Sequence, residues 1–152
     1  MVEFVLKMPP RGKKNSRPIF KNKKTGKMFL GKDKVQRSYE ASMIAAMKEI
    51  LEAQVERTWP LEGSVEASYH ISFKGYQRSD FDNVLAMIND CAQEAGLFLD
   101  SDRQIRRVAS VEVCDYTGED RIVARFASIE KPKKLASKSK KLSEIAALFR
   151  RE

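Results

Sequence analysis

Two aspartates one residue apart, Asp80 and Asp82, are the strongest candidates for chemistry in this sequence. In an extended segment, residues i and i+2 project to the same side about 6.6 Å apart, so both carboxylates can bind one cation while Phe81 turns into the core. Carboxylates held this close repel each other, and a divalent cation removes the repulsion. Acidic residues also cap helices, and Asp82 by itself is a suitable N-cap. The pair alone leaves metal binding and helix capping both open.

A second acidic cluster, Asp100-Ser101-Asp102-Arg103, comes later in the chain. The segment between the clusters has the pattern of a helix that ends at Gly96, a natural left-handed C-cap. The two clusters can meet only if the loop after Gly96 returns to the start of that helix. Asp90 lies about 12 Å from Asp82 along the helix axis, so we expect it to have a structural role or to lie on a subunit surface.

The charge of the chain is distributed unevenly. Its 152 residues include 29 Lys and Arg against 21 Asp and Glu, a net charge of +8. Residues 1–37 have a balance of +10, residues 38–130 one of −8, and residues 131–152 one of +6. A carboxylate-rich body between basic segments suits a metal-dependent enzyme that acts on a polyanion, because basic groups bind phosphates while carboxylates bind cations. Nucleic acid is the expected partner, and solvated basic termini are the alternative.

The single His and the two Cys exclude several kinds of site. A zinc ribbon and an H-E-x-x-H protease need more His or Cys than the chain has. Cys91 and Cys114 are too few and too far apart for a disulfide framework, so we expect reduced thiols and a cytoplasmic location. No apolar run approaches membrane-spanning length. His70 falls on the polar face of an alternating strand, and we interpret it as a surface residue.

The hydrophobic pattern predicts a mixed α+β fold. We expect strands over residues 2–8, 65–74, 105–114 and 121–129, a hairpin over 17–30, and helices from Asp33 and over about 82–95. The first helix should bury a face formed by Val35, Tyr39, Met43, Ala46 or Met47, and Ile50. These elements predict one small domain over residues 1–130 with a mixed, partly antiparallel sheet and two main helices. Residues 131–152 are expected to form a basic linker and a short amphipathic helix.

One stretch of the sequence resembles a known family. The sequence Asp-Phe-Asp-Asn at 80–83, a helix of about thirteen residues ending in Glu94-Ala95-Gly96, and the following Leu97-Phe98-Leu99-Asp100-Ser101-Asp102-Arg103-Gln104-Ile105 closely resemble the core of the RusA-type Holliday junction resolvases. The resemblance is strongest over residues 78–105. It extends more loosely over residues 1–130, including Pro9-Pro10 and Asn15-Ser16-Arg17, and does not reach the tail.

This resemblance implies a dimeric, Mg²⁺-dependent endonuclease, with Mn²⁺ as an alternative ion, that nicks four-way DNA junctions symmetrically in recombination and repair. The paired metal ligands of the family fall on Asp80 and Asp82. The third falls before the Gln-Ile pair, on Asp102, with Asp100 as the neighbouring candidate. The family tends to place a Lys where this chain has Ala86. A different base, for which we consider Lys74, Arg78 and Arg103, would then supply the positive charge.

The expected partner is branched DNA, without a membrane or a small-molecule cofactor. We expect DNA contacts from Lys13, Lys14, Arg17, Lys21, Lys23, Lys24, Lys27, Arg78 and Arg103. Two symmetric nicks need two metal sites, which predicts a homodimer. The surplus apolar residues of the second helix are the expected interface: Val84, Met87 and Cys91, with Leu97 beyond it.

Two rival functions remain. A non-catalytic DNA- or junction-binding module of the same fold would explain the absence of Lys at position 86. A sugar-nucleotide transferase that uses Asp-x-Asp is less consistent with the sequence, because we find no Gly-rich phosphate loop and the chain is short for a nucleotide-binding fold.

Overall fold

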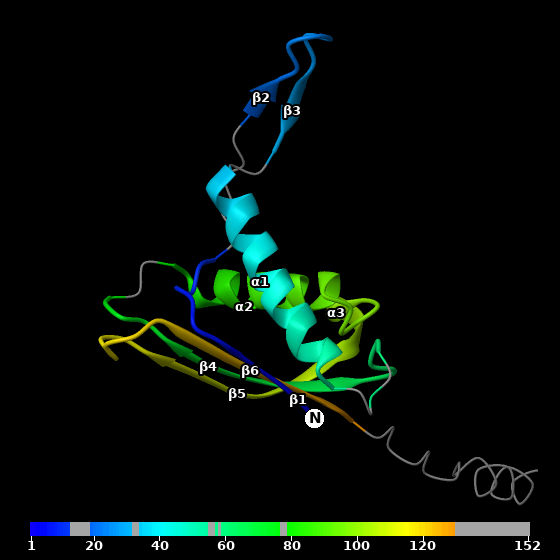
Figure 1. The fold of residues 1–152 in the computed structure, drawn as a ribbon, viewed down its shortest axis with the longest axis vertical. Helices are drawn as coiled ribbons and strands as arrows, with labels where there is room; N and C mark the ends of the chain where they lie inside the picture. The colour runs from blue at the N-terminus through cyan, green and yellow to red at the C-terminus, as the bar shows by residue number, and fades with distance from the viewer. Residues whose placement is uncertain (13–18, 32–33, 55–56, 58, 77–78, 130–152) are drawn as a thin grey trace, which may run out of the picture.

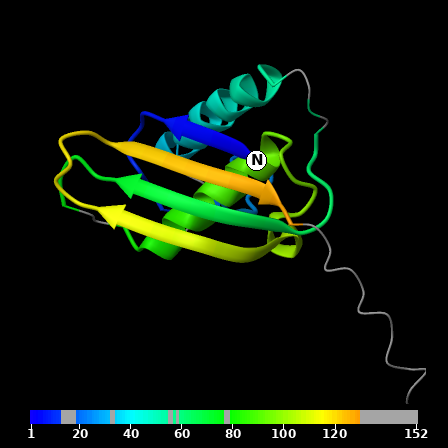
Figure 2. The same ribbon diagram turned by 90° about the horizontal axis from the view of Figure 1, so that it is seen from below.

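The computed structural model describes residues 1–12, 19–31, 34–54, 57, 59–76 and 79–129. A four-stranded sheet is covered on one face by two long helices (Figure 1). The opposite face of the sheet carries no helix from the described part of the chain (Figure 2). This arrangement confirms the predicted α+β class. The predicted C-terminal helix and linker lie outside the described residues.

The sheet has the strand order β1-β6-β4-β5. Its strands are β1 (Val2–Leu6), β4 (Val65–Ser72), β5 (Ile105–Cys114) and β6 (Arg121–Ser128). Strand β6 pairs antiparallel with both β1 and β4, whereas β4 and β5 are parallel. The sheet is therefore mixed and partly antiparallel, as the sequence predicts.

Helix α2 (Phe81–Glu94) connects the two parallel strands. Parallel neighbours need a crossover connection, so α2 begins at the end of the sheet where β4 finishes and runs back to the end where β5 starts (Figure 1). Gly96 has φ +99, which confirms the predicted left-handed residue after this helix. A one-turn helix, α3 (Ser101–Gln104), precedes β5 where the sequence suggests a loop.

Strand β4 supplies the middle of the core. Val65, Ala67, Tyr69 and Ile71 are buried and alternate with less buried residues, because successive side chains of a strand point to opposite faces. The alternation confirms the pattern expected for this strand. Around it, the ring of Phe126 makes edge-to-face contacts with Phe4, Tyr69 and Phe98 at centroid distances of 6.0, 5.9 and 5.1 Å.

Helix α1 (Lys34–Glu52) buries a face different in part from the expected one. Met43, Met47 and Leu51 are buried, but Val35 is 61% exposed. The reason is that the first turns of α1 extend past the sheet (Figure 1), where no core is available to cover Val35. Asp33, the predicted N-cap, lies outside the described residues.

A two-stranded hairpin projects away from the main sheet beyond the start of α1 (Figure 1). It consists of β2 (Ile19–Lys21) and β3 (Met28–Leu30), which confirms the predicted hairpin. Asn22 Oδ1 accepts hydrogen bonds from the backbone N–H groups of Lys24 and Thr25 at 2.9 and 3.2 Å. Gly26, at φ +69, occupies the left-handed position of the turn.

The predicted subunit interface on α2 is wrong. Val84, Met87, Cys91 and Leu97 are each at most 2% exposed, so they are not available to a second chain. Helix α2 lies on the sheet beside α1 (Figure 2), so it buries one face against the sheet and another against α1. The apolar surplus of α2 therefore belongs to the core of one subunit.

A buried tyrosine gives the fold a dependence on alkaline pH. Burial raises the pKa of Tyr69 to about 12, and its hydroxyl donates a hydrogen bond to Asn89 Oδ1 at 2.7 Å. Because the pKa is higher in the folded state, the neutral phenol stabilises the fold below pH 10, and this stabilisation is lost as the pH rises from 10 to about 12. We expect Tyr69→Phe to reduce the fall in the free energy of unfolding over that range. Urea titrations at pH 9 to 12 test this, and identical pH slopes for the two proteins would contradict it.

Candidate metal site and nucleic-acid interface

The two aspartates of the first cluster lie at the N-terminal end of α2. Asp80 occupies the N-cap position with φ −58 and ψ 128, and Asp82 lies in the first turn. Only Asp80 is therefore extended, and the expected strand-like spacing of the pair is wrong. Phe81, expected in the core, is the first residue of the helix and is 45% exposed. Both carboxylates are exposed to solvent.

The structure bears on the choice between capping and metal binding. The side chain of Asp80 makes no capping hydrogen bond to the backbone of α2. Its Oδ2 accepts a long hydrogen bond from Asn83 Nδ2 at 3.4 Å. The positive end of the helix dipole favours negative charge at this point. Helix capping does not account for either carboxylate, so both remain available to a cation.

A segment that sequence reasoning missed lies beside this pair. A Cβ atom added to Gly12 would lie 2.7 Å from Asn83 Cβ and 3.5 Å from Ser79 Cβ, so the chain after β1 passes directly over the start of α2. Arg11 stacks on the ring of Tyr39 at 5.6 Å. Arg11, Gly12 and Tyr39 line a cavity of about 260 Å³ together with Ser79. The approach is long-range, and no pattern in the sequence indicates it.

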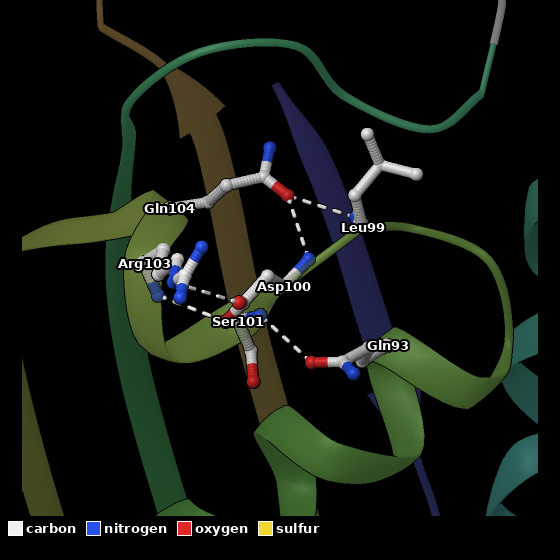
Figure 3. Close-up of polar contacts among 6 residues, drawn as sticks. All are labelled: Gln93, Leu99, Asp100, Ser101, Arg103 and Gln104. Atoms are coloured by element: carbon white, nitrogen blue, oxygen red, sulfur yellow. Dashed lines mark hydrogen bonds and ion pairs between the residues drawn. The ribbon is translucent and has the colours of Figure 1, made fainter.

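The second acidic cluster has a different structural role (Figure 3). Asp100 is the N-cap of α3, where its Oδ1 accepts a hydrogen bond from the backbone N–H of Arg103 at 3.1 Å. Its other oxygen lies 3.3 Å from Arg103 Nε. Asp102 is exposed in the first turn of α3. Capping therefore accounts for Asp100, which supports the choice of Asp102 as the ligand candidate.

Two glutamines hold the turn that carries Asp102 (Figure 3). Gln104 Oε1 accepts from the backbone N–H groups of Leu99 and Asp100 at 2.8 and 3.0 Å, and its Nε2 donates to the carbonyl of Leu61 at 2.6 Å. Gln93 Oε1, at the last turn of α2, accepts from Ser101 N at 2.7 Å. The turn is thus fixed to the C-terminal end of α2.

One chain does not bring the two acidic clusters together. Asp80 lies at the start of α2, whereas Ser101 is bonded to Gln93 at its end. Thirteen residues of helix span about 20 Å, and the loop after Gly96 does not return to the start of α2 (Figure 1). Asp102 therefore cannot share a cation with Asp80 and Asp82 of its own chain.

Comparison of the sequence with models of known protein families finds no match, and a search of curated proteins finds none either. The resemblance to RusA-type resolvases therefore rests on the motif residues themselves.

The predicted DNA-binding residues divide into three groups. Lys21, Lys23, Lys24 and Lys27 are exposed on the projecting hairpin. Arg103 is exposed but forms an ion pair with Asp100. The others lie outside the described residues: Lys13, Lys14, Arg17 and Arg78. Of the candidates to replace the family Lys, Lys74 is exposed, whereas Ala86 itself is half-buried on α2.

The hairpin lysines predict a specific salt dependence. Each Lys that contacts a phosphate contributes about 0.9 to the slope of log affinity against log salt. We expect the triple variant Lys21→Ala, Lys23→Ala, Lys24→Ala to lower the magnitude of that slope by up to about 3. Fluorescence anisotropy with a labelled junction over a series of salt concentrations measures it. Lys48→Ala, an exposed lysine on α1, is the control, and an unchanged slope in the triple variant would exclude the hairpin from the interface.

In the described part of the chain, none of the helices has the length and apolar character needed to cross a membrane.

Proposed function

We propose that the protein is a Mg²⁺- or Mn²⁺-dependent endonuclease that resolves four-way DNA junctions by paired symmetric nicks. The main support for the proposal is that the carboxylates of the first acidic pair are exposed and do not cap the helix. Asp80 occupies a cap position without capping, and Asp82 follows in the first turn. Both are exposed at the positive end of α2, next to the segment that contains Arg11 and Gly12. A cytoplasmic location is part of the same proposal.

The chain can perform this reaction through a few of its own residues. Asp80 and Asp82 would hold the cation, which, when bound, lowers the pKa of an attacking water and stabilises the leaving oxygen. Arg11 lies against Tyr39 beside the cavity at the start of α2, where its guanidinium can bind a phosphate of the cleaved strand. The hairpin lysines hold the DNA by charge and do not read bases.

The third ligand would come from a second copy of the chain. Strand β5 is an edge strand of the sheet, and Val108, Val111 and Val113 are 52%, 39% and 36% exposed. An unpaired, apolar edge is a template for pairing with another strand. We therefore propose that two β5 strands pair antiparallel across a two-fold axis.

The residues of β5 complement each other in this pairing. With the two-fold axis between Ala109 and Ser110, Val108 lies opposite Val111. The register with β4, which shifts by one residue between Val108 and Ser110, puts both valines on the helix-covered face, so the pair shares a face. Apolar pairs stabilise directly paired strands.

This pairing would complete the metal site. Asp102 precedes the start of β5 in the same chain, and antiparallel pairing carries the start of one β5 to the end of the other. That end of the sheet is where β4 finishes and α2 begins (Figure 1). Asp102 of the partner subunit would then lie beside Asp80 and Asp82, which explains why one chain keeps the clusters apart.

A cleavage assay on a synthetic four-way junction tests the function. We expect symmetric nicks in the presence of Mg²⁺ and none with EDTA, with linear duplex of the same sequence as the control. Binding to the junction without cleavage in either Mg²⁺ or Mn²⁺ would favour the alternative, a non-catalytic junction-binding module.

A further inference from the structure

The open face of the sheet carries a group of three different ligand types. His70 lies on β4, and Glu112 and Cys114 lie on the neighbouring strand β5. One ligand atom from each residue lies within 4.8 Å of the others: an imidazole nitrogen, a carboxylate oxygen and a thiol sulfur. We propose that these residues bind a thiophilic divalent cation such as Zn²⁺, at a site separate from the aspartates at the start of α2.

The parallel register brings the three side chains together. His70 pairs with Glu112, and Ser72 pairs with Cys114. Neighbouring strands lie about 4.8 Å apart, and alternate residues of a strand share a face. His70, Glu112 and Cys114 therefore point to the same face, opposite α1 and α2. The site needs both strands and forms only in the folded sheet.

The imidazole of His70 is held between two partners. Its Nδ1 lies 2.9 Å from Glu112 Oε2, and its Nε2 lies 3.2 Å from Ser72 Oγ. If the ring proton is on Nε2, that N–H donates a hydrogen bond to Ser72 Oγ, and Nδ1 beside Glu112 keeps its lone pair for a cation. A metal-binding His commonly donates its other N–H to such a partner, which fixes the ring and the tautomer. The hydroxyl of Ser72 is well placed for this role because Ser72 is only 6% exposed.

The ligand set determines the kind of cation. Nitrogen and thiolate ligands favour Zn²⁺, whereas Mg²⁺ prefers oxygen ligands. Tetrahedral zinc ligands lie about 3.5 Å from one another, and Cys114 Sγ is now 3.9 Å from Glu112 Oε1. On binding, the sulfur–metal bond replaces the S–H bond of Cys114, and the proton leaves to solvent. The thiolate and the carboxylate then balance the charge of the cation, and water fills the fourth position.

One neighbouring charge opposes cation binding. Arg121 lines the same hollow of about 290 Å³ as His70 and Glu112. The other arginine of the hollow, Arg125, forms an ion pair with Glu3. Because Arg121 repels a cation, Arg121→Gln should tighten binding, whereas Arg121 would strengthen the binding of an anion. The sign of this effect separates a cation site from an anion site.

Cobalt absorption tests the site directly, because Co²⁺ replaces Zn²⁺ and bonds between Co²⁺ and thiolate give an intense charge-transfer band. Co²⁺ is added to the purified, reduced protein with excess Mg²⁺. We expect this band in the wild-type protein and its loss when Zn²⁺ is added. It should be absent in Cys114→Ser and present in Cys91→Ala, which removes the buried thiol. Ser72→Ala should weaken Co²⁺ binding by about ten- to a hundredfold.

The double variant Asp80→Asn, Asp82→Asn separates this site from the proposed nuclease site, and it should retain the band. Absence of the band in folded wild-type protein would overturn the proposal. So would its persistence in Cys114→Ser, its loss in Cys91→Ala with retained circular dichroism, or weaker binding in Arg121→Gln. The assay requires no nuclease activity. The zinc site can therefore be refuted while the proposed nuclease function holds, and the nuclease function can be refuted while the zinc site holds.

Discussion

Asp80→Asn and Asp82→Asn are each expected to reduce Mg²⁺-dependent junction cleavage by more than about a hundredfold, because loss of the partners that merely orient metal ligands already costs 10- to 100-fold. Junction binding should be unchanged or tighter, since each substitution removes a negative charge that faces the phosphates. Asparagine keeps the size of the side chain and is a good N-cap residue, so the fold should persist. Gel assays of binding and cleavage with the same labelled junction measure both effects.

Two controls define this prediction. Glu49→Gln removes an exposed carboxylate from α1 and should leave cleavage unchanged. Asp102→Asn should be as damaging as the first two substitutions, while Asp100→Asn should be mild because asparagine can still cap α3. Cleavage at the wild-type rate in both Asp80→Asn and Asp82→Asn would refute the nuclease assignment. The opposite ranking of Asp100 and Asp102 would move the third ligand to Asp100.

Mixed dimers are expected to recover activity from two inactive chains. Asp102→Asn retains the pair at the start of α2, and Asp80→Asn retains Asp102. If each site takes Asp102 from the other subunit, a dimer of these two variants contains one complete site, so nicking should return to about half the wild-type rate per dimer. Co-expression with two affinity tags and tandem purification isolates the mixed dimer. If all ligands came from one chain, neither chain would be complete and the mixture would stay inactive.

The interface needs its own control. Val108→Asp with Val111→Asp puts like charges opposite each other in the proposed β5 pairing and should give a monomer in sedimentation. Val108→Lys with Val111→Asp puts opposite charges together and should restore the dimer. A dimer in both variants would show that the subunits associate through a different surface. A monomer in both would show that charge repulsion is not what separates the subunits.

Elements with a strong periodic pattern could be predicted from the sequence. Apolar residues alternate along β4 because one face of the strand is buried, so the apolar positions of residues 65–72 are also the positions that contact the core. Helix α3 could not be predicted, because its four residues are held by Gln93 and Gln104 through contacts outside the helix. The prediction of a subunit interface on α2 fails for a related reason. A sequence shows that Met87 is apolar, but not whether α1 or a second chain covers it.

The candidate site was predicted only in part. The positions of Asp80 and Asp82 at the start of a helix were predictable from Gly96 and the apolar pattern. Their separation from Asp102 was not, because it depends on the crossover between two parallel strands. The approach of Gly12 to Asn83 joins segments about seventy residues apart in the chain, and a single sequence gives no signal for such a contact.

The order of strands also has a consequence for synthesis of the protein. Among the described strands, β1 pairs only with β6, so the residues of β1 must wait until the last of these strands has been made. Until then Val2, Phe4 and Leu6 have no strand to pair with, and the hydrophobic face of α2 is incompletely covered. Closing such long loops is slow, so the nascent chain is exposed to aggregation until residue 128 has left the ribosome. A chaperone that binds short apolar segments would act on this chain before folding.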